Sequence, residues 1–466
     1  QATVDSLNAL VWGPLTILLL VGTGLYFTVR LRGIQVVRLA LSVRLLGRVR
    51  GADQPEQGSI SRFSALTVAL SAAIGNGNIA GVATAIALGG PGAVLWMWLT
   101  AVVGMATVYA STLLAMQFRQ YRPETGEYAG GPMYYIEQGL GRRWKPLAVF
   151  FAVCIVIAAA GTGNLVEANS VADTLEFSLR DLVGYDADPA TIRGVKVGIG
   201  ILYAAVIWLV IVGGIRRIGQ VVSRLVPLMF LVYTFSALTV LVINAELIPG
   251  ALLTIVRDAF TGTSAVGGFA GAGVMTVIQF GIARGVFSNE AGMGTIPIAM
   301  AASKSDHPVK VGLAAMNAPV IDTLIVCTIT AMVIITSGTW QSGVSGSQLT
   351  TMAFNDAVPH LGKIAVTLSL MFFSVSSVIG WSYYGEKGVE YLAGSRYIGL
   401  YRKVFCLLLT LGAAMKLELV WALCDIANGL VAIPNLIALL LLSPIVVRIT
   451  RAYFAGAGAA VNDRKP

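Results

Sequence analysis

Residues 63–118 form one apolar stretch without a single Asp, Glu, Lys or Arg. In the whole chain 56% of the residues are hydrophobic and 12% are charged, whereas a soluble globular domain carries about 25% charged residues. So few charges cannot cover a water-exposed surface, and about 20 consecutive apolar residues are enough to cross a bilayer. The apolar runs are continuous rather than alternating, which disfavours a β-barrel. The sequence therefore predicts an all-α polytopic membrane protein.

Eleven apolar segments have the length expected of transmembrane helices. They cover residues 8–29, 63–89, 91–118, 146–172, 194–215, 219–245, 266–302, 309–338, 361–386, 398–416 and 419–447. Several are longer than a bilayer requires, which predicts tilted or interrupted helices. The first segment is long enough to span, so we expect a membrane helix there rather than a cleaved signal peptide.

The distribution of basic residues predicts the orientation in the membrane. With the N-terminus outside, 25 of the 32 Lys and Arg residues fall on inside loops or the C-terminal tail, and six fall outside. Cytoplasmic loops are enriched in Lys and Arg. We therefore expect a multi-pass protein of the cell (plasma or inner) membrane with its C-terminus in the cytoplasm. The net charge of +9 reflects this asymmetry, and we expect no nucleic-acid partner.

Few residues are suited to catalysis or to binding a transition metal. The four cysteines lie in apolar segments without metal-ligand spacing, and the chain has only two histidines. The sequence contains no phosphate-binding loop of the form GxxxxGK[ST]. We therefore expect neither enzymatic activity nor a cofactor, and no ATP-driven transport.

The segment AAIGNGNIAG, residues 72–81, interrupts the uncharged stretch with three glycines and two asparagines. Glycine costs about 1 kcal/mol relative to alanine inside a helix. Unwound backbone within a membrane is tolerated only where it is buried in protein or lines a cavity. There, freed carbonyls can coordinate a cation, and freed N–H groups with the following half-helix can hold a carboxylate. The segment therefore predicts a binding site at a broken helix.

A second such segment, GIARGVFSNEAGMGT, covers residues 281–295. Each segment begins a set of five predicted spans, and two interrupted helices at corresponding positions indicate a transporter built from inverted repeats. Close helix packing at small residues is the alternative for each glycine cluster. We expect an extra helix and basic loop at 1–62, a first repeat at 63–250, a second at 251–448 and a cytoplasmic tail at 449–466.

Several stretches resemble the alanine or glycine:cation symporter family, and the resemblance extends over nearly the whole chain. These stretches are IGNGNIAGVATAIALGGPGAVLWMW (74–98), GGPMYYIEQGLG (130–141), RGVFSNEAGMGT (284–295), DTLIVCTIT (322–330), GWSYYGEK (380–387) and AIPNLIALLLL (432–442). The resemblance implies a leucine-transporter-like fold, with a five-plus-five inverted repeat and one extra N-terminal helix. It also implies sodium-driven import of small neutral amino acids, alanine or glycine, by alternating access.

The same resemblance implies a sodium site between the first and eighth core helices. Backbone carbonyls would come from Ser71, Ile74 and Phe373, and hydroxyls from Ser376 and Ser377. Hard oxygen ligands suit a hard cation. The alternative for both hydroxyls is a hydrogen bond back to their own helix.

The substrate site implied by the resemblance lies at the same break. The Gly75–Asn76–Gly77 backbone would hold the substrate carboxylate, and Trp381 would pack beside the substrate. Asn78 and the Ala73 carbonyl would contact either the substrate or a second cation.

Four positions depart from the family's usual residues. Asn76 and Ser377 stand where Thr is usual, Glu167 where Gln is usual, and Ser111 where Glu is usual. The resemblance places Glu167 in the substrate site. A carboxylate inside a membrane is a functional hypothesis because burying an unpaired charge is costly. Glu167 could stay protonated and mimic Gln, could pair with an ammonium group, or could carry a coupling proton.

Arg284 and three acids, Glu290, Asp322 and Asp425, also lie within predicted spans. Arg284 and Glu290 are close enough in sequence to pair or to bond the broken backbone, so we expect a structural role for both. Asp322 is either a hydrogen-bonded helix anchor or a group beside a cation path.

The leading functional hypothesis is a sodium-coupled amino-acid symporter. Its partners would be a small amino acid, sodium and the lipid bilayer, and the sequence leaves the oligomeric state open. A proton-coupled or altered-specificity member, taking a larger polar or amine-bearing substrate through Glu167, is the runner-up. A membrane receptor, a channel and a membrane enzyme are the alternatives from other classes.

Overall fold

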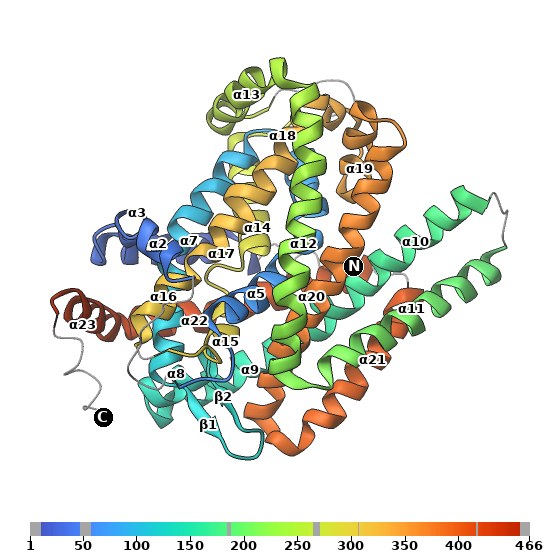
Figure 1. Cartoon of the computed structure of the whole chain (residues 1–466). Coiled ribbons are helices and arrows are strands. Elements are labelled where there is room, and N and C mark those ends of the chain that lie inside the picture. The colour runs from blue at the N-terminus through green and yellow to red at the C-terminus, as the bar shows by residue number, and fades with distance from the viewer. Residues whose placement is uncertain are drawn as a thin grey trace.

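The computed structural model describes residues 11–46, 57–183, 188–263, 271–305, 307–415 and 418–456, and nearly all of them are helical (Figure 1). The first part of the predicted span 8–29 and residues 457–466 of the predicted tail lie outside the described residues. Helix α2, Pro14–Arg30, is followed at a sharp turn by two short helices, α3 Ile34–Val37 and α4 Leu39–Arg44.

The first half of the remaining chain contains a broken helix, a short hairpin and four long helical segments. Its elements are α5 Arg62–Ala73, η1 Gly77–Gly81, α6 Val82–Gly89, α7 Ala93–Gln117, β1 Gln120–Arg122, β2 Glu127–Ala129, α8 Pro132–Gly139, η2 Arg142–Trp144, α9 Lys145–Ala160, η3 Gly161–Val166, α10 Glu167–Val183, α11 Pro189–Ile211 and α12 Gly214–Ile243. Strands β1 and β2 pair antiparallel, with Tyr121 opposite Tyr128.

The second half contains another broken helix, after η4 and α13. Its elements are η4 Ala245–Leu247, α13 Ile248–Thr261, α14 Val274–Asn289, α15 Ile296–Met300, α16 Pro308–Ala315, α17 Asn317–Pro319, η5 Val320–Cys327, α18 Thr328–Ser337, η6 Thr339–Ser342, α19 Gly346–Ala357, α20 Leu361–Ala393, η7 Ser395–Tyr397, α21 Ile398–Ala414, α22 Glu418–Leu441 and α23 Ser443–Phe454.

Within the described residues, seven helices are long and apolar enough to cross a membrane. The count rises to nine if each of two bent pairs is one span; these pairs are Arg62–Ala73 with Gly77–Gly89 and Ile426–Leu441 with Ser443–Phe454. The predicted count of eleven also includes the 17-residue helix α2 and the interrupted segment at 266–302, of which residues 266–270 are not described. The multi-pass architecture is therefore confirmed, and the exact number of spans stays a prediction.

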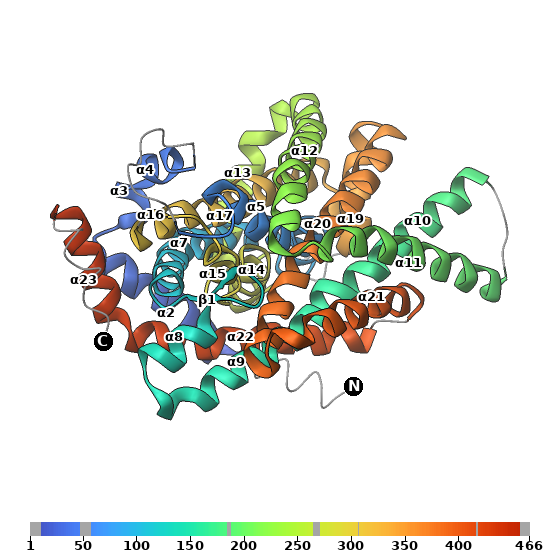
Figure 2. The same ribbon diagram turned by 60° about the horizontal axis from the view of Figure 1, so that its bottom comes forward.

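Helix α7 packs against α2, α14, α15 and α16 (Figures 1 and 2). Small residues allow this close packing: a Cβ at Gly281 would come within 2.5 Å of the Ala93 carbonyl oxygen, and one at Gly285 within 2.4 Å of Thr100 Oγ1. Helix α20 crosses the molecule beside α5, α9 and α12. The two broken helices are thereby held against one another in the interior.

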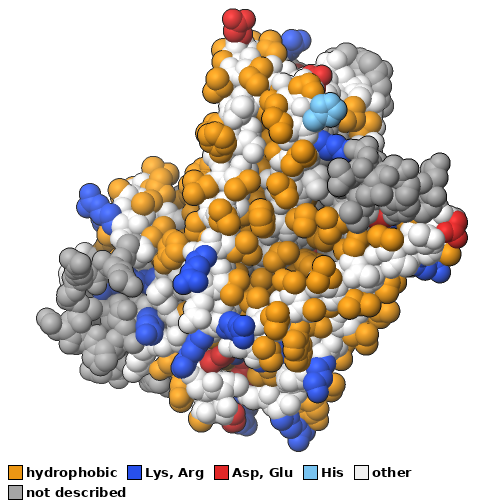
Figure 3. All heavy atoms as spheres, turned by 45° about the vertical axis from the view of Figure 1, so that its right-hand side comes forward, with side chains coloured by type: hydrophobic (Ala, Val, Ile, Leu, Met, Phe, Trp, Pro, Cys, Tyr) orange, Lys and Arg blue, Asp and Glu red, His pale blue; other side chains and the backbone are white. Residues whose placement is uncertain are grey.

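The surface matches a protein that faces lipid. Hydrophobic side chains cover the middle of the face shown in Figure 3, and most of its Lys and Arg side chains lie towards the end that carries β1, β2 and α8. Exposed apolar residues gather on α11, α12 and α21, for example Leu202, Phe235 and Leu407, which are 69%, 76% and 59% exposed. An apolar belt of this extent is what a bilayer would cover.

Buried ion pairs tie the hairpin to the end of α20. The Nζ of Lys387, whose side chain is fully buried, lies 3.1 Å from Glu127 Oε2 and 2.7 Å from Glu390 Oε2. Arg402 on α21 pairs with Glu386 at 2.8 Å and donates to the Val212 carbonyl between α11 and α12. Together these bonds join β2, α20, α21 and the α11–α12 turn at one end of the bundle.

Candidate functional site

The first break lies where the sequence predicts it. Helix α5 ends at Ala73, Ile74 is extended (φ −79°, ψ 94°), and the helix that resumes at Gly77 is bent by 53°. In a continuous helix the Gly75 N–H would donate to the Ser71 carbonyl. Here it donates to Asn78 Oδ1 at 3.0 Å. The Asn78 side chain therefore replaces a backbone acceptor and frees the Ser71 carbonyl.

The second break is shorter than the sequence predicts. Helix α14 continues through Gly281, Arg284 and Gly285 to Asn289, and only residues 290–295 are irregular. The prediction over 281–295 is wrong for its first part because Gly281 and Gly285 serve close packing against α7, the alternative for such clusters. Arg284 lies on the intact helix, with its guanidinium over the Phe287 ring.

Backbone strain marks the start of the second break. Glu290 adopts a left-handed conformation (φ +53°), and Gly292 and Gly294 also have positive φ. Strained residues of this kind concentrate at functional sites. Glu290 is 2% exposed, and its Oε2 atom has no hydrogen-bond partner among the described residues.

The two breaks are joined through Asp322, which lies on the π-helical turn η5. Its Oδ1 accepts from Asn78 Nδ2 at 2.6 Å, and its Oδ2 accepts from Ser288 Oγ at 2.9 Å and from Thr323 Oγ1 at 2.7 Å. The carboxylate is fully buried. Of the two roles expected for Asp322, the hydrogen-bonded anchor is thus present. Asn78 is turned towards this anchor and is not among the residues that line the cavity described below.

Oxygen atoms converge between α5 and α20. Ser376 Oγ lies 2.9 Å from the Phe373 carbonyl oxygen, 3.4 Å from that of Ser71 and 3.5 Å from that of Ile74. Ser377 Oγ lies 3.3 Å from the Ala72 carbonyl oxygen. The five residues predicted to hold sodium are therefore brought together, and Ser376 also makes the alternative bond to its own helix.

A small cavity opens beside these oxygens. It is lined by Ala72, Ala73, Gly75, Asn76, Gly77, Thr162, Val166, Glu167, Phe287, Glu290, Ser377, Trp381 and Asn428. Its volume is about 20 Å³, which is close to the space needed by one water molecule. Six of the seven residues predicted for the substrate line it, and Asn78 is the exception.

Glu167 enters this cavity from the first turn of α10, directly after the π-helical turn η3. It is 5% exposed, and its Oε2 accepts a hydrogen bond of 2.9 Å from Asn76 Nδ2. A Cβ added to Gly75 would lie 3.0 Å from Glu167 Oε1 and 3.1 Å from Ser377 Oγ. Three of the four departures from the family pattern, at Asn76, Glu167 and Ser377, therefore meet at one place.

The remaining departure is separate from this group. Ser111 Oγ donates to the Val108 carbonyl of its own helix α7 at 3.1 Å. The Ser111 hydroxyl thus has a hydrogen-bond acceptor within its own helix. Glu167 is bonded to Asn76 instead.

The sequence analysis missed part of the cavity wall. Thr162 and Asn428 come from η3 and α22, and Asn428 Nδ2 donates to Thr162 Oγ1 at 3.0 Å. No sequence signal marks Asn428, because its apolar segment lacks the cluster of glycines that identifies the two breaks. Glu290 was expected to be structural, yet it faces the cavity.

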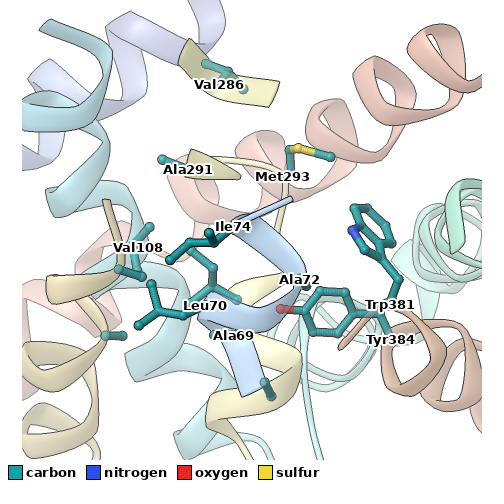
Figure 4. Packing of buried hydrophobic residues seen from close by; sticks show 14 of the residues in the cluster. Ala69, Leu70, Ala72, Ile74, Val108, Val286, Ala291, Met293, Trp381 and Tyr384 are labelled. Atoms are coloured by element: carbon teal, nitrogen blue, oxygen red, sulfur yellow. The ribbon is translucent and has the colours of Figure 1, made fainter. Parts of the chain in front are cut away.

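Figure 4 shows how the parts face one another. Ile74 lies at the end of the α5 ribbon, with Ala291 and Met293 of the second break beside it, and Trp381 and Tyr384 of α20 on the other side. Trp381 is 3% exposed. It approaches η3 so closely that a Cβ at Gly163 would come within 2.1 Å of Trp381 Cβ.

The model of the sodium:alanine symporter family matches residues 1–465. The chain belongs to this family. The sodium/alanine symporter AgcS of Methanococcus maripaludis is 44% identical over 456 residues, covering 97% of this chain and 96% of that protein. The probable sodium/glutamine symporter GlnT of Bacillus subtilis is 36% identical, covering 96% of this chain and 89% of that protein.

A solved structure shows the same fold. The crystal structure of MhsT in complex with L-phenylalanine superposes with a TM-score of 0.58 at 14% identity, covering 86% of this chain and 99% of that chain. The fold is therefore leucine-transporter-like, as the resemblance implies. A family member is a transport protein, which agrees with the expectation that this chain is not an enzyme.

A methyl group at Gly163 tests whether Trp381 forms the cavity wall. The methyl group of Gly163→Ala would displace Trp381, because it would clash with Trp381 Cβ. Overpacking of this kind costs about 1–3 kcal/mol. We expect alanine binding to the purified protein, measured with radiolabelled alanine, to fall by about tenfold. Gly81→Ala is the matched control, since a Cβ there meets nothing within 4 Å. Equal affinities in the two variants would contradict this assignment.

Proposed function

We propose that this protein is a sodium-coupled secondary-active symporter that imports small neutral amino acids, alanine or glycine, by alternating access. The observation that carries the proposal is that the converging oxygens and the cavity share one stretch of backbone, residues 71–77, which contains the first break. A cation and a substrate bound there would both depend on the conformation of the same backbone.

The converging oxygens have the character of a cation site. The Ser376 hydroxyl has one hydrogen, yet the carbonyl oxygens of Ser71, Ile74 and Phe373 all lie within 3.5 Å of it. At least two of these carbonyls therefore present lone pairs that this hydroxyl cannot satisfy. Carbonyl and hydroxyl oxygens suit a hard cation, and the Met229 sulfur also lies 3.2 Å from Ser376 Oγ. We assign the sodium ligands to these three carbonyls and to the hydroxyls of Ser376 and Ser377.

The cavity offers complementary groups to an amino-acid zwitterion. Gly77 begins η1, which continues into α6, so the positive end of this half-helix would face a carboxylate, while the Gly75 N–H is already bonded to Asn78 Oδ1. Glu167 and Glu290 lie across the same cavity and would face an ammonium group. Trp381, Phe287 and Val166 form bulky walls, and a cavity of about 20 Å³ must widen even for glycine, which favours the smallest amino acids, alanine or glycine.

Coupling follows from the shared backbone. A sodium ion that holds the Ser71 and Ile74 carbonyls fixes the residues that bind the substrate, so each ligand raises the affinity for the other. This linkage is reciprocal. The basic loops favour an outside N-terminus and a cytoplasmic C-terminus in the cell membrane, so the inward sodium gradient would drive import. The two five-helix repeats at 63–250 and 251–448 would supply the opposite-facing states.

A proton-coupled or altered-specificity member is the second candidate, taking a larger polar or amine-bearing substrate. The observation that favours it is the Glu167 carboxyl, which is buried in the cavity with one amide donor, Asn76. A carboxyl in this position could exchange a proton during transport or bind a second amine.

Transport with separate gradients distinguishes the two candidates. Proteoliposomes containing the full chain would receive radiolabelled alanine or glycine under an inward sodium gradient or an inward proton gradient. We expect the sodium gradient alone to drive uptake, and Glu167→Gln to keep at least about half of the rate, because Gln retains the hydrogen bond to Asn76. Uptake driven by protons, or uptake of these amino acids only after the substitution, would establish the second candidate instead.

Removal of one hydroxyl tests the sodium site. Ser376→Ala removes a ligand that faces three carbonyls, so we expect the sodium concentration for half-maximal uptake to rise by about tenfold, equivalent to ~1.4 kcal/mol. Ser382→Ala is the control on the same helix, since Ser382 donates only to Ile379 of that helix among its described contacts. The sodium site lies elsewhere if both variants show the parent's sodium dependence.

A further inference from the structure

A second cavity lies far from the first, between the end of α2, helix α3 and helix α23. It has a volume of about 460 Å³ and is referred to below as the α2–α23 pocket. Four arginines line it, together with apolar side chains of Leu31, Ile34, Val37 and Phe454; the arginines are Arg30, Arg32, Arg38 and Arg451. Helices α3 and α23 lie next to each other here, and the Arg38 guanidinium is 4.3 Å from the centre of the Phe454 ring (Figures 1 and 2).

Among the described residues, no carboxylate neutralises the positive charge of this pocket. The helices α2, α3, α4, α7, α16 and α23 contain no Asp or Glu. Within the described residues, none of the four guanidinium groups forms an ion pair with a carboxylate. Four like charges gathered around one cavity repel each other, so an anion bound between them would be stabilised.

The backbone holds these arginines in place. The chain reverses at Arg32 and Gly33, which both have positive φ (+56° and +66°). For Arg32 this conformation is strained, and strain of this kind is kept where surrounding structure or function requires it. Stacking on the Phe454 ring orders the Arg38 guanidinium group. A guanidinium so ordered matches the oxygens of a phosphate group.

The apolar rim of the pocket continues along surfaces that face lipid. Val29, Val36 and Val37 are 75%, 71% and 66% exposed, and Leu18 and Leu25 extend this strip along α2. Helix α23 is bent by 61° from α22 and carries its buried side chains on one face. A helix with this bend and pattern lies along a membrane surface rather than across it. The pocket thus lies at the level where headgroups meet acyl chains.

We propose that the α2–α23 pocket binds the phosphate of an anionic phospholipid, with the acyl chains along the exposed strip of α2. The chemistry it recognises is a phosphate oxyanion, and basic pockets between membrane helices bind such headgroups. The continuous apolar strip favours a lipid over free phosphate, because free phosphate would use only the arginines. The basic loops place this pocket on the cytoplasmic side. The site is independent of the transport site proposed above.

Thermal melting of the full chain in detergent tests this site. The protein would be titrated with phosphatidylglycerol, with phosphatidylcholine as the zwitterionic lipid, and with inorganic phosphate. We expect phosphatidylglycerol alone to raise the melting temperature in a saturable way, with an effect that weakens at high salt. An equal effect of phosphatidylcholine would overturn the proposal, and an equal effect of inorganic phosphate would reassign the pocket to free phosphate.

Charge removal locates the effect. The variant R38Q/R451Q should weaken the apparent affinity for phosphatidylglycerol by about thirtyfold, since each basic residue near a membrane surface contributes about fivefold. R451Q alone leaves Arg38 stacked on Phe454 and should weaken the apparent affinity for phosphatidylglycerol by about fivefold. R143Q/R396Q removes two exposed arginines elsewhere and should titrate like the parent. If R451Q also titrates like the parent, the pocket does not bind the headgroup.

Discussion

Every backbone polar group inside a membrane needs a partner, and the site of this protein depends on how that requirement is met at one residue. The Gly75 N–H donates to the Asn78 side chain rather than to the Ser71 carbonyl. Asn78 is fixed in turn by Asp322, which also holds Ser288 near the second break. The helix can therefore stop at Ala73 while the Gly75 N–H keeps a partner. The carbonyls of Ser71 and Ile74 become available as a result.

Much of this arrangement could be predicted from the sequence. Glycines and asparagines within an uncharged stretch have few explanations other than a break, and the first break lies where the pattern predicts it. The second break could not be delimited in this way. Gly281 and Gly285 lie within α14 because they pack against α7, and Gly292 and Gly294 adopt positive φ because the chain turns there. Only tertiary contacts distinguish the two uses of glycine.

The residues of the cavity wall could likewise be predicted only in part from the sequence. Glu167 and Trp381 could be named from a family resemblance, whereas Asn428 and Thr162 come from helices without a local signal. The structure also brings together residues that are far apart in the sequence. Asn76 donates to Glu167, and Ser377 lies beside both at Gly75. Three departures from the usual family residues thus change the polarity of the cavity at one place. The fourth, Ser111, does not contact these three residues.

Equilibrium binding tests the central claim, that a cation and a small amino acid share the first break. Radiolabelled alanine would be bound to the purified protein over a series of sodium concentrations, and sodium affinity would be measured with and without alanine. The account predicts that sodium strengthens alanine binding and that alanine strengthens sodium binding by the same factor. Alanine binding that is saturable but independent of sodium would contradict it.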